Sequence, residues 1–234
     1  MARLPAPISR QDRQRQTREA LVFAARAVFA RDGYHGARLD VIAREAGFSK
    51  GAVYSNFTGK AALFLEVMDA NLQAASADGG WDVFESSPQG GAGAVPTEEI
   101  QEAVKGFALA TLEFIATAAR DVDLAAQLQT RMQALAAGYA AVAAQSRPES
   151  ETMPPEEVGA LLTALDQGAA LLTLSGSTAI DQRVLRTGMR RLLDPARAAE
   201  EPEADGDDEP ALHDRVIRER IAATVREWPT SSTP

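Results

Sequence analysis

Residues 17–64 read TREALVFAARAVFARDGYHGARLDVIAREAGFSKGAVYSNFTGKAALF, and this stretch decides the fold. In its first part apolar residues recur three and four positions apart, the spacing of one helix face. These residues are Leu21, Ala24, Ala25, Val28 and Phe29. Gly33 follows this pattern and Gly47 follows the next one. A glycine in that position typically ends a helix, so the stretch predicts short helices in close succession.

The connection between the second and third helical patterns is short. Residues 39–46, LDVIAREA, form the second pattern, and KGAVYSNF, residues 50–57, forms a third of about two turns. Ser49 precedes the third helix and can cap it by accepting from backbone N–H groups of the first turn. A glycine-containing turn of this length is typical of a helix-turn-helix, whose second helix lies in the major groove of DNA.

The same residues resemble the N-terminal domain of the TetR family of bacterial transcriptional regulators. The matching elements are IA-x-x-AG, then S-K-G-x-x-Y-x-x-F, then K-x-x-L, in order and without gaps. The resemblance implies an all-α fold, with an N-terminal helix-turn-helix three-helix domain and a C-terminal helical domain for ligand binding and dimerisation. It implies a helix-turn-helix DNA-binding domain at residues 17–64 and a helical regulatory and dimerisation domain at 65–195. Outside the family pattern, we expect a basic flexible arm at 1–16 and an acidic linker with a C-terminal amphipathic helix at 196–234.

Carried over position by position, the resemblance implies two kinds of DNA contact. Tyr54, Asn56 and Lys60 would contact phosphates, and Lys50, Ala52 and Ser55 would contact base edges. Small residues at positions 51 and 52 would let the helix approach the bases closely. The predicted DNA-binding residues are Arg38, Ser49, Lys50, Gly51, Ala52, Tyr54, Ser55, Asn56 and Lys60.

The chain departs from the family pattern at two places. Asn56 stands where the family most often has histidine, and both residues can donate to a phosphate. Ala37 and Arg38 stand where family members usually offer threonine or serine to cap the second helix. A missing capping oxygen costs that helix start about 1 kcal/mol. We hypothesise that Arg38 instead reaches a phosphate.

Charge is unevenly distributed along the chain. The net charge is −9, yet residues 1–72 carry 11 Lys and Arg against 7 Asp and Glu, while the remaining 162 residues carry 13 against 26. Affinity for DNA depends on local basic residues that displace counterions from phosphates, so the basic N-terminal part is the relevant one. The arginines at positions 3, 10, 13 and 15 have two interpretations: a basic arm laid along DNA, or a solvated tail.

Composition excludes several classes of protein. A hydrophobic content of 45% with 24% charged residues is typical of a soluble globular protein. The chain has no cysteine, which removes disulfides, thiol catalysis and thiolate zinc sites and suits the cytoplasm, the location we expect. No apolar run follows Arg3, so we expect no signal peptide. Residues 158–180 are apolar over the length of a membrane span, but Asp166 and Gln167 interrupt them and favour a buried interface helix.

Further helical patterns fill the C-terminal part. We expect helices at residues 60–77, 97–119, 121–145, 154–175 and 181–194, with a Gly/Pro/Ser loop at 86–96. Those at 154–175 and 181–194 resemble the pair with which the family dimerises as a four-helix bundle; the alternative is internal core. Residues 200–209 hold seven acids and predict a solvated linker, or a segment that competes with DNA for the arm. An amphipathic helix follows at 211–228 and would bury its stripe in the dimer or the regulatory domain.

Evidence for catalysis or metal binding is weak. The two histidines, His35 and His213, lie far apart in sequence without metal-ligand spacing, and no nucleophile elbow or phosphate-binding glycine loop occurs. We therefore expect that the protein is not an enzyme and that it uses no cofactor. Two neighbouring helices combine aromatic, flexible apolar and hydrogen-bonding residues, as an effector pocket would or as ordinary core would. The candidate ligand-binding residues are Phe107, Thr111, Phe114, Gln127, Met132, Leu135 and Tyr139.

The sequence therefore predicts a homodimeric TetR-type repressor that leaves a palindromic double-stranded DNA operator when a small-molecule effector of unknown identity binds. Membranes are not expected as partners. Two alternatives stay open. One is a helical enzyme that has kept the fold, and the other is a protein-interaction adaptor or small-molecule-binding protein whose DNA binding has lapsed. Salt-dependent, sequence-selective DNA binding would separate the repressor from both.

Overall fold

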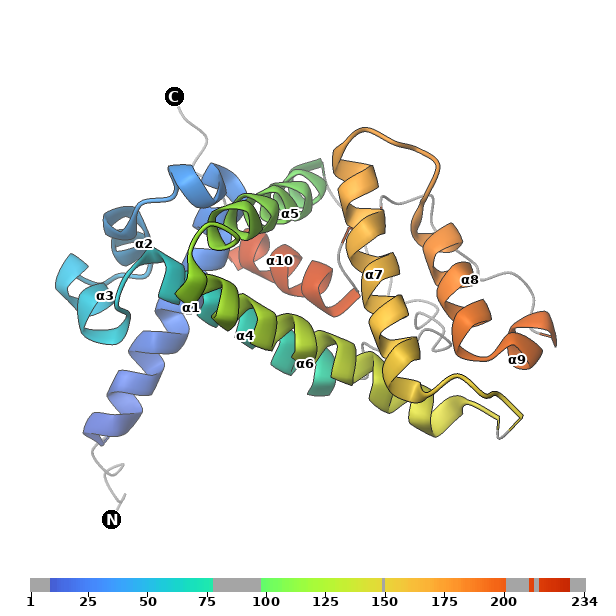
Figure 1. The fold of residues 1–234 in the computed structure, drawn as a ribbon. Coiled ribbons are helices and arrows are strands. Elements are labelled where there is room, and N and C mark those ends of the chain that lie inside the picture. Colours follow the sequence, from blue (N-terminus) through green and yellow to red (C-terminus); the bar gives the residue numbers. More distant parts are fainter. Residues whose placement is uncertain (1–8, 78–97, 149, 201–210, 213–214, 228–234) are drawn as a thin grey trace, which may run out of the picture.

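The computed structural model describes residues 9–77, 98–148, 150–200, 211–212 and 215–227. Within these ranges every regular element is a helix, which confirms the all-α fold (Figure 1). The helices are α1 (Arg10–Gly36), α2 (Leu39–Glu45), α3 (Lys50–Asn56), α4 (Lys60–Ala77), α5 (Glu98–Ala118), α6 (Val122–Ser146), α7 (Pro155–Leu174), α8 (Gln182–Leu193), α9 (Pro195–Glu200) and α10 (Arg215–Glu227). The expected loop at 86–96 and the acidic residues 201–209 lie outside the described residues.

Helix α1 begins earlier than the apolar pattern suggests. Ser9 caps it, because its hydroxyl accepts from the backbone N–H of Asp12 at 3.0 Å. Arg10, Arg13 and Arg15 are therefore helical, and only residues 1–8 of the basic segment lie outside the described part. Gly33 interrupts the helix with a φ of 72°, a conformation that favours glycine, and one more turn follows to Gly36.

The connection from α2 to α3 is the tight turn that the sequence predicts. Gly47 adopts a φ of 76°, and the backbone N–H of Phe48 donates to the carbonyl of Ala43 at 2.8 Å. Ser49 then caps α3, with its hydroxyl accepting from the N–H of Ala52 at 3.3 Å. Local chemistry at two positions therefore fixes the angle between the two helices.

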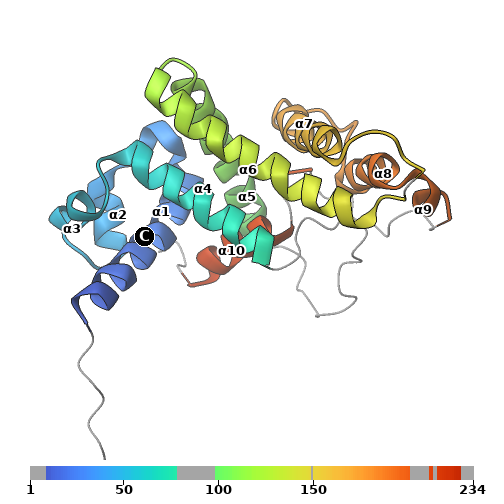
Figure 2. The ribbon, with the colours of Figure 1, turned by 60° about the horizontal axis from the view of Figure 1, so that its bottom comes forward.

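Two buried cores hold the helices together. The first core contains residues of all five helices from α1 through α5, together with residues of α10, and it is rich in aromatic rings. In it Phe64 packs edge-on to Phe29, and the ring centroids of Phe64 and Phe114 are 4.7 Å apart. The second joins α6, α7 and α8 and is aliphatic except for Tyr139. Figure 2 shows α5 and α6 between the helix-turn-helix end of the molecule and the α7–α8 end. Helix α5 belongs to the same core as the helix-turn-helix, so the two parts meet through continuous packing.

The C-terminal helix α10 packs against α1, α4 and α5. It buries Ile221, Ala222 and Thr224 there. The sequence predicts the amphipathic stripe of this helix. It does not predict that the stripe contacts α1, which precedes the helix-turn-helix, and α4, which follows it. No helix in the described ranges is both long and apolar enough to cross a membrane.

Candidate DNA-binding surface

Helix α3 presents one face to solvent and buries the other. Val53 and the capping residue Phe57 are buried in the first core. Lys50, Gly51 and Ser55 are exposed, Ala52 is half-buried, and the ring of Tyr54 is 54% exposed. The ammonium of Lys50 lies 5.8 Å from the centre of the Tyr54 ring, so the two side chains share one face. Most of the predicted DNA-contacting residues therefore lie together on one accessible surface.

Arg18 holds the end of α3 in place. Its Nε and Nη2 donate to the carboxylate of Glu66 on α4 at 3.0 and 2.6 Å, and its Nη1 donates to the carbonyl of Asn56 at 2.7 Å. The guanidinium also lies 4.3 Å from the centre of the Phe57 ring. One side chain thus joins α1, α3 and α4. The sequence showed Arg18 only as part of a polar helix face, since its partners are 38 and 48 positions away.

The side chain of Asn56 is directed inward. Its Nδ2 donates to the carbonyl of Ala52 at 2.8 Å, and its Oδ1 is buried with no hydrogen-bond partner among the described residues. The hydroxyl of Ser55 donates to the same carbonyl at 3.0 Å. Contact between Asn56 and a phosphate therefore requires the side chain to rotate out of this position.

Lys60 connects the start of α4 to the end of α1. Its ammonium donates to the carbonyls of His35 at 2.9 Å and Ala37 at 3.1 Å, and it lies 5.0 Å from the centre of the Tyr34 ring. Burial lowers the pKa of Lys60, and the nearby carboxylate of Glu113 opposes this shift. An ammonium has three donors, so one remains for a phosphate.

The start of α2 lacks a side-chain cap, as the sequence predicts. Arg38 occupies the capping position without making a capping hydrogen bond. Its guanidinium donates instead to the carboxylate of Asp40, through Nε at 3.1 Å and Nη2 at 2.8 Å. This pairing raises the pKa of Arg38 and lowers that of Asp40. Both groups are solvent-exposed, where ion pairs contribute little, so Arg38 can exchange Asp40 for a phosphate at small cost.

Helix α5 lies directly on α1. A Cβ atom added at Gly106 would come within 1.9 Å of the carbonyl oxygen of Ala30, so only glycine permits this approach. Further along, the carboxylate of Glu113 accepts from the backbone N–H of His35 at 3.0 Å, beside the turn at Gly33. Helix α5 therefore contacts α1 at Ala30 and again at its end, next to the helix-turn-helix.

The seven candidate ligand-binding residues are divided between the two cores. Phe107 and Phe114 pack on Phe64 in the first core, whereas Leu135 and Tyr139 belong to the second, and Met132 packs against both. Thr111 is half-buried and donates to the carbonyl of Phe107, and Gln127 is exposed. Periodicity predicts which residues turn inward without indicating which helix they meet.

Helix α7 has an exposed apolar face. Leu161, Leu165 and Leu172 lie on one side of the helix and are 41–44% exposed, and Leu171 is 53% exposed. Val184 of the neighbouring α8 is exposed as well, and a Cβ added at Gly168 or Gly188 would meet nothing within 4 Å. The neighbouring side of α7 is buried through Val158, Leu162 and Ala169, in the core that α7 shares with α6. Exposed leucines in a row are typical of a protein–protein interface.

Comparisons with known proteins agree with this geometry. The profile of bacterial regulatory proteins of the tetR family matches residues 21–67. The HTH-type transcriptional regulator TtgW of Pseudomonas putida, itself uncharacterised, is 47% identical over 58 residues, which cover 25% of this chain and only 40% of the relative. The HTH-type transcriptional repressor BepR of Brucella suis is 26% identical over 77% of this chain and 94% of its own length.

A solved structure extends the likeness beyond the helix-turn-helix. A Rhodococcus sp. protein described as a TetR-family transcriptional regulator superposes with a TM-score of 0.54 at 20% sequence identity. The superposition covers 79% of this chain and 98% of that protein. The 47% identity extends over 58 residues, whereas the structural likeness extends over most of the chain.

Proposed function

This chain belongs to the TetR family of bacterial regulatory proteins, and from that premise we propose that it is a repressor that leaves its operator when a small molecule binds. The observation that carries the proposal is the capped and clamped α3, whose outer face presents Lys50 and Tyr54 to solvent. A helix held rigidly at both ends with an accessible basic and polar face fits the major groove. The protein would act where the genomic DNA is, in the cytoplasm.

The operator would be palindromic because the repressor would be a homodimer. Two copies joined through the exposed leucines of α7 and α8 would place two α3 helices in a twofold arrangement. Half-sites would then lie about 34–36 Å apart, or a multiple of that distance. The BepR relative is named a repressor, which supports the same role for this chain.

Release by an effector would use the contact between α5 and α1. The candidate effector residues are Phe107, Thr111, Phe114, Gln127, Met132, Leu135 and Tyr139. A small molecule that inserts beside the buried members, Phe107 and Phe114 of α5 or Leu135 and Tyr139 of α6, must displace one of these helices. Helix α5 would carry the displacement to His35 through Glu113. The effector weakens DNA binding only by the difference between its affinities for the two conformers.

The test is a titration of fluorescent DNA from the protein's own upstream region against a scrambled duplex, at two salt concentrations. We expect selective binding that weakens as salt rises, because phosphate contacts release counterions. Lys50→Ala and Tyr54→Ala should each weaken operator binding by roughly tenfold or more, the value of one good base or phosphate contact. Arg120→Ala is the control, since Arg120 is exposed just beyond the end of α5 and its guanidinium donates to the carbonyl of Ala116 on that same helix.

Two results would contradict the proposal. Unchanged affinity in both α3 variants would show that α3 is not the recognition helix. The second result is weak binding that is equal for the scrambled duplex and for every fragment tested, whether from the upstream region or from a genome-wide selection. It would favour a ligand-binding or adaptor protein whose DNA binding has lapsed.

A further inference from the structure

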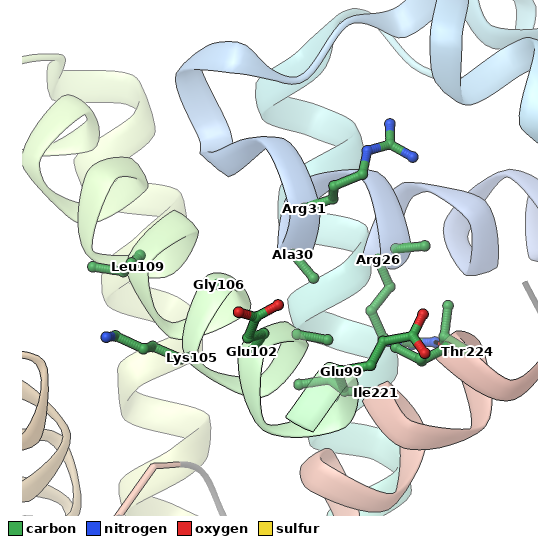
Figure 3. A pocket seen from close by; sticks show the side chains of 13 residues that line it. Arg26, Ala30, Arg31, Glu99, Glu102, Lys105, Gly106, Leu109, Ile221 and Thr224 are labelled. Carbon is green, nitrogen blue, oxygen red and sulfur yellow. Dashed lines mark hydrogen bonds between the residues drawn. The ribbon is translucent and has the colours of Figure 1, made fainter. Parts of the chain in front are cut away.

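A cavity of about 400 Å³ lies between α1, α5 and α10, and none of the seven candidate effector residues lines it (Figure 3). It is open to solvent on one side. Its walls are formed by Arg26, Ala27, Ala30, Arg31, Glu99, Glu102, Ala103, Lys105, Gly106, Leu109, Ile221, Thr224 and Val225. The cavity therefore joins the first helix of the DNA-binding region, the first helix of the C-terminal part and the last helix of the chain.

The buried group on its wall is Arg26. The residue is 3% exposed, and its Nε donates to Oδ1 of Asn71 at 3.2 Å and its Nη1 to the hydroxyl of Thr224 at 3.5 Å. Both partners are neutral, and no carboxylate in the described part of the chain lies within ion-pair distance of it. A buried charge without a partner of opposite sign is costly, and proteins rarely retain one.

The charge that acts on Arg26 has the same sign. Burial first, and then repulsion by Arg220 of α10, lower the pKa of Arg26 to about 10, so it still carries its proton at neutral pH. Arg220 donates to the carbonyl of Ala70, another neutral group. Two guanidinium groups, one from α1 and one from α10, thus repel each other, and an anion placed beside Arg26 would relieve the repulsion.

The remaining charges of the cavity are at its mouth. Arg31 is already neutralised by Asp32 at 2.8 Å and Glu45 at 3.0 Å. Lys105, Glu99 and Glu102 are exposed on α5. The inner end is therefore positive and the mouth carries charges of both signs, while alanines, Ile221 and Val225 supply apolar wall between them. This arrangement favours a ligand with a negative charge at its inner end and an apolar body.

We propose that this cavity binds a small organic monocarboxylate, with the carboxylate accepting hydrogen bonds from Arg26 and the apolar body lying between α1, α5 and α10. Guanidinium donors suit a carboxylate, and the pair is strong where solvent is excluded. Because the site uses side chains of α1 and α10, an occupied site holds α10 more firmly onto the DNA-binding region. The proposal concerns ligand binding by the free protein and does not depend on the repressor function.

Benzoate and octanoate are the probes, and their binding to the full chain is measured by calorimetry and by the shift in melting temperature. We expect at least one of them to bind one per chain with a Kd below about 1 mM. Benzamide, the neutral analogue of benzoate, should bind roughly tenfold or more weakly than benzoate.

Variants assign the binding to this cavity. Arg26→Met removes the charge at similar length, so it should abolish binding while the apo protein melts at the same or a higher temperature. Ala27→Phe fills the cavity and leaves Arg26 in place, so it should abolish binding as well. Thr130→Val is the control: Thr130 lies on the exposed side of α6, donates to the carbonyl of Ala126 and does not line the cavity, so this variant should bind as the unmodified chain does. Failure of both probes to bind, or binding that survives Arg26→Met and Ala27→Phe, would overturn the proposal.

Discussion

The helix-turn-helix region and helix α7 differ in whether their surface side chains have partners within the chain. In the helix-turn-helix region, long basic side chains are fastened within the chain: Arg18 to Glu66 and Asn56, Lys60 to two carbonyls of α1, and Arg31 to Glu45. On α7, by contrast, a row of leucines is left exposed beside the face that is buried in the second core. The basic side chains of the helix-turn-helix region find their hydrogen-bond partners within the same chain. The leucine row of α7 instead has the composition of a surface that a partner protein covers.

This difference has a physical reason. A recognition helix must keep its orientation whether or not DNA is present, because each degree of freedom that DNA has to freeze reduces affinity. Contacts to a charged group are suited to that task, since they are directional. An exposed leucine row is costly in water, and its burial under a partner surface would favour association.

The largest effect is expected on the α7 face. Leu165→Glu would place two carboxylates in a twofold interface, one from each chain, and burying an unpaired charge costs several kcal/mol per ion. We expect the variant to be monomeric at concentrations at which the unmodified chain is dimeric, as measured by sedimentation velocity. Operator binding should fall with dimer formation, because both half-sites can no longer be occupied together.

Val122→Glu is the control for that experiment. Val122 is 87% exposed at the start of α6, so the variant makes the same change of charge on an apolar residue outside the leucine row. It should remain dimeric. A dimeric Leu165→Glu protein would instead assign the leucine row to some other contact and remove the contrast between the two ends.

The next largest effect is expected where the two ends meet. Gly106→Ala places a Cβ 1.9 Å from the carbonyl oxygen of Ala30, and both groups belong to backbones that cannot rotate away. Overpacking of this kind typically costs about 1–3 kcal/mol. We expect a corresponding fall in the free energy of unfolding by urea, together with weaker operator binding, since α5 has to move off α1.

Gly36→Ala makes the same chemical change without the clash. The nearest atom to its added Cβ would be Cβ of Asp32 at 3.7 Å, an ordinary contact. Its stability should change by less than about 0.5 kcal/mol, as for surface substitutions generally. If Gly106→Ala proved equally harmless, α5 would not be seated on α1 as closely as described.

Arg18→Met tests the fastening of α3 and should have a smaller effect on stability. The variant removes hydrogen bonds to Glu66 and Asn56 and keeps most of the apolar stem over Phe57. The ion pair is about one third exposed, so solvent screening limits the loss to about 1–2 kcal/mol. Operator affinity should fall further than this stability loss explains, because α3 loses its fixed orientation.

Arg15→Met is the matched variant three residues away. Arg15 is 68% exposed and pairs with Asp12 and Glu19 on its own helix, so its loss should hardly change stability. Equal loss of operator affinity in both variants would mean that Arg18 acts through its charge alone and does not orient α3.

Sequence reasoning was successful where the cause is local. The turn at Gly47, the cap by Ser49 and the missing cap at Arg38 follow from residues within a few positions of each other. Asp181 likewise begins α8, accepting from the N–H of Val184 at 2.7 Å. The all-α fold could be predicted for the same reason, because the helical spacing of apolar residues can be found within each segment separately.

Contacts between distant segments could not be obtained in this way. Arg26 and Thr224 are 198 positions apart, and no local pattern indicates that α10 returns to the DNA-binding region. The candidate effector residues show the same limit, because the inward spacing of Phe107 and Tyr139 is common to both cores and does not reveal which core each one enters. Their role in ligand binding stays a prediction.

The smallest effect concerns the uncapped start of α2. Arg38→Ser supplies the hydroxyl that the position lacks, and a side-chain cap is worth about 1 kcal/mol, so the free energy of unfolding should rise by that amount with an unchanged m-value. Ser49→Ala, which removes the existing cap of α3, should lower it by a similar amount. If Arg38 also contacts a phosphate, Arg38→Ser must bind operator more weakly although it is more stable. The slope of log affinity against log salt concentration should then become shallower by about one, which corresponds to one counterion fewer released. A variant that is more stable and binds operator unchanged would show that Arg38 has no phosphate contact; one that is no more stable would show that α2 does not need the cap.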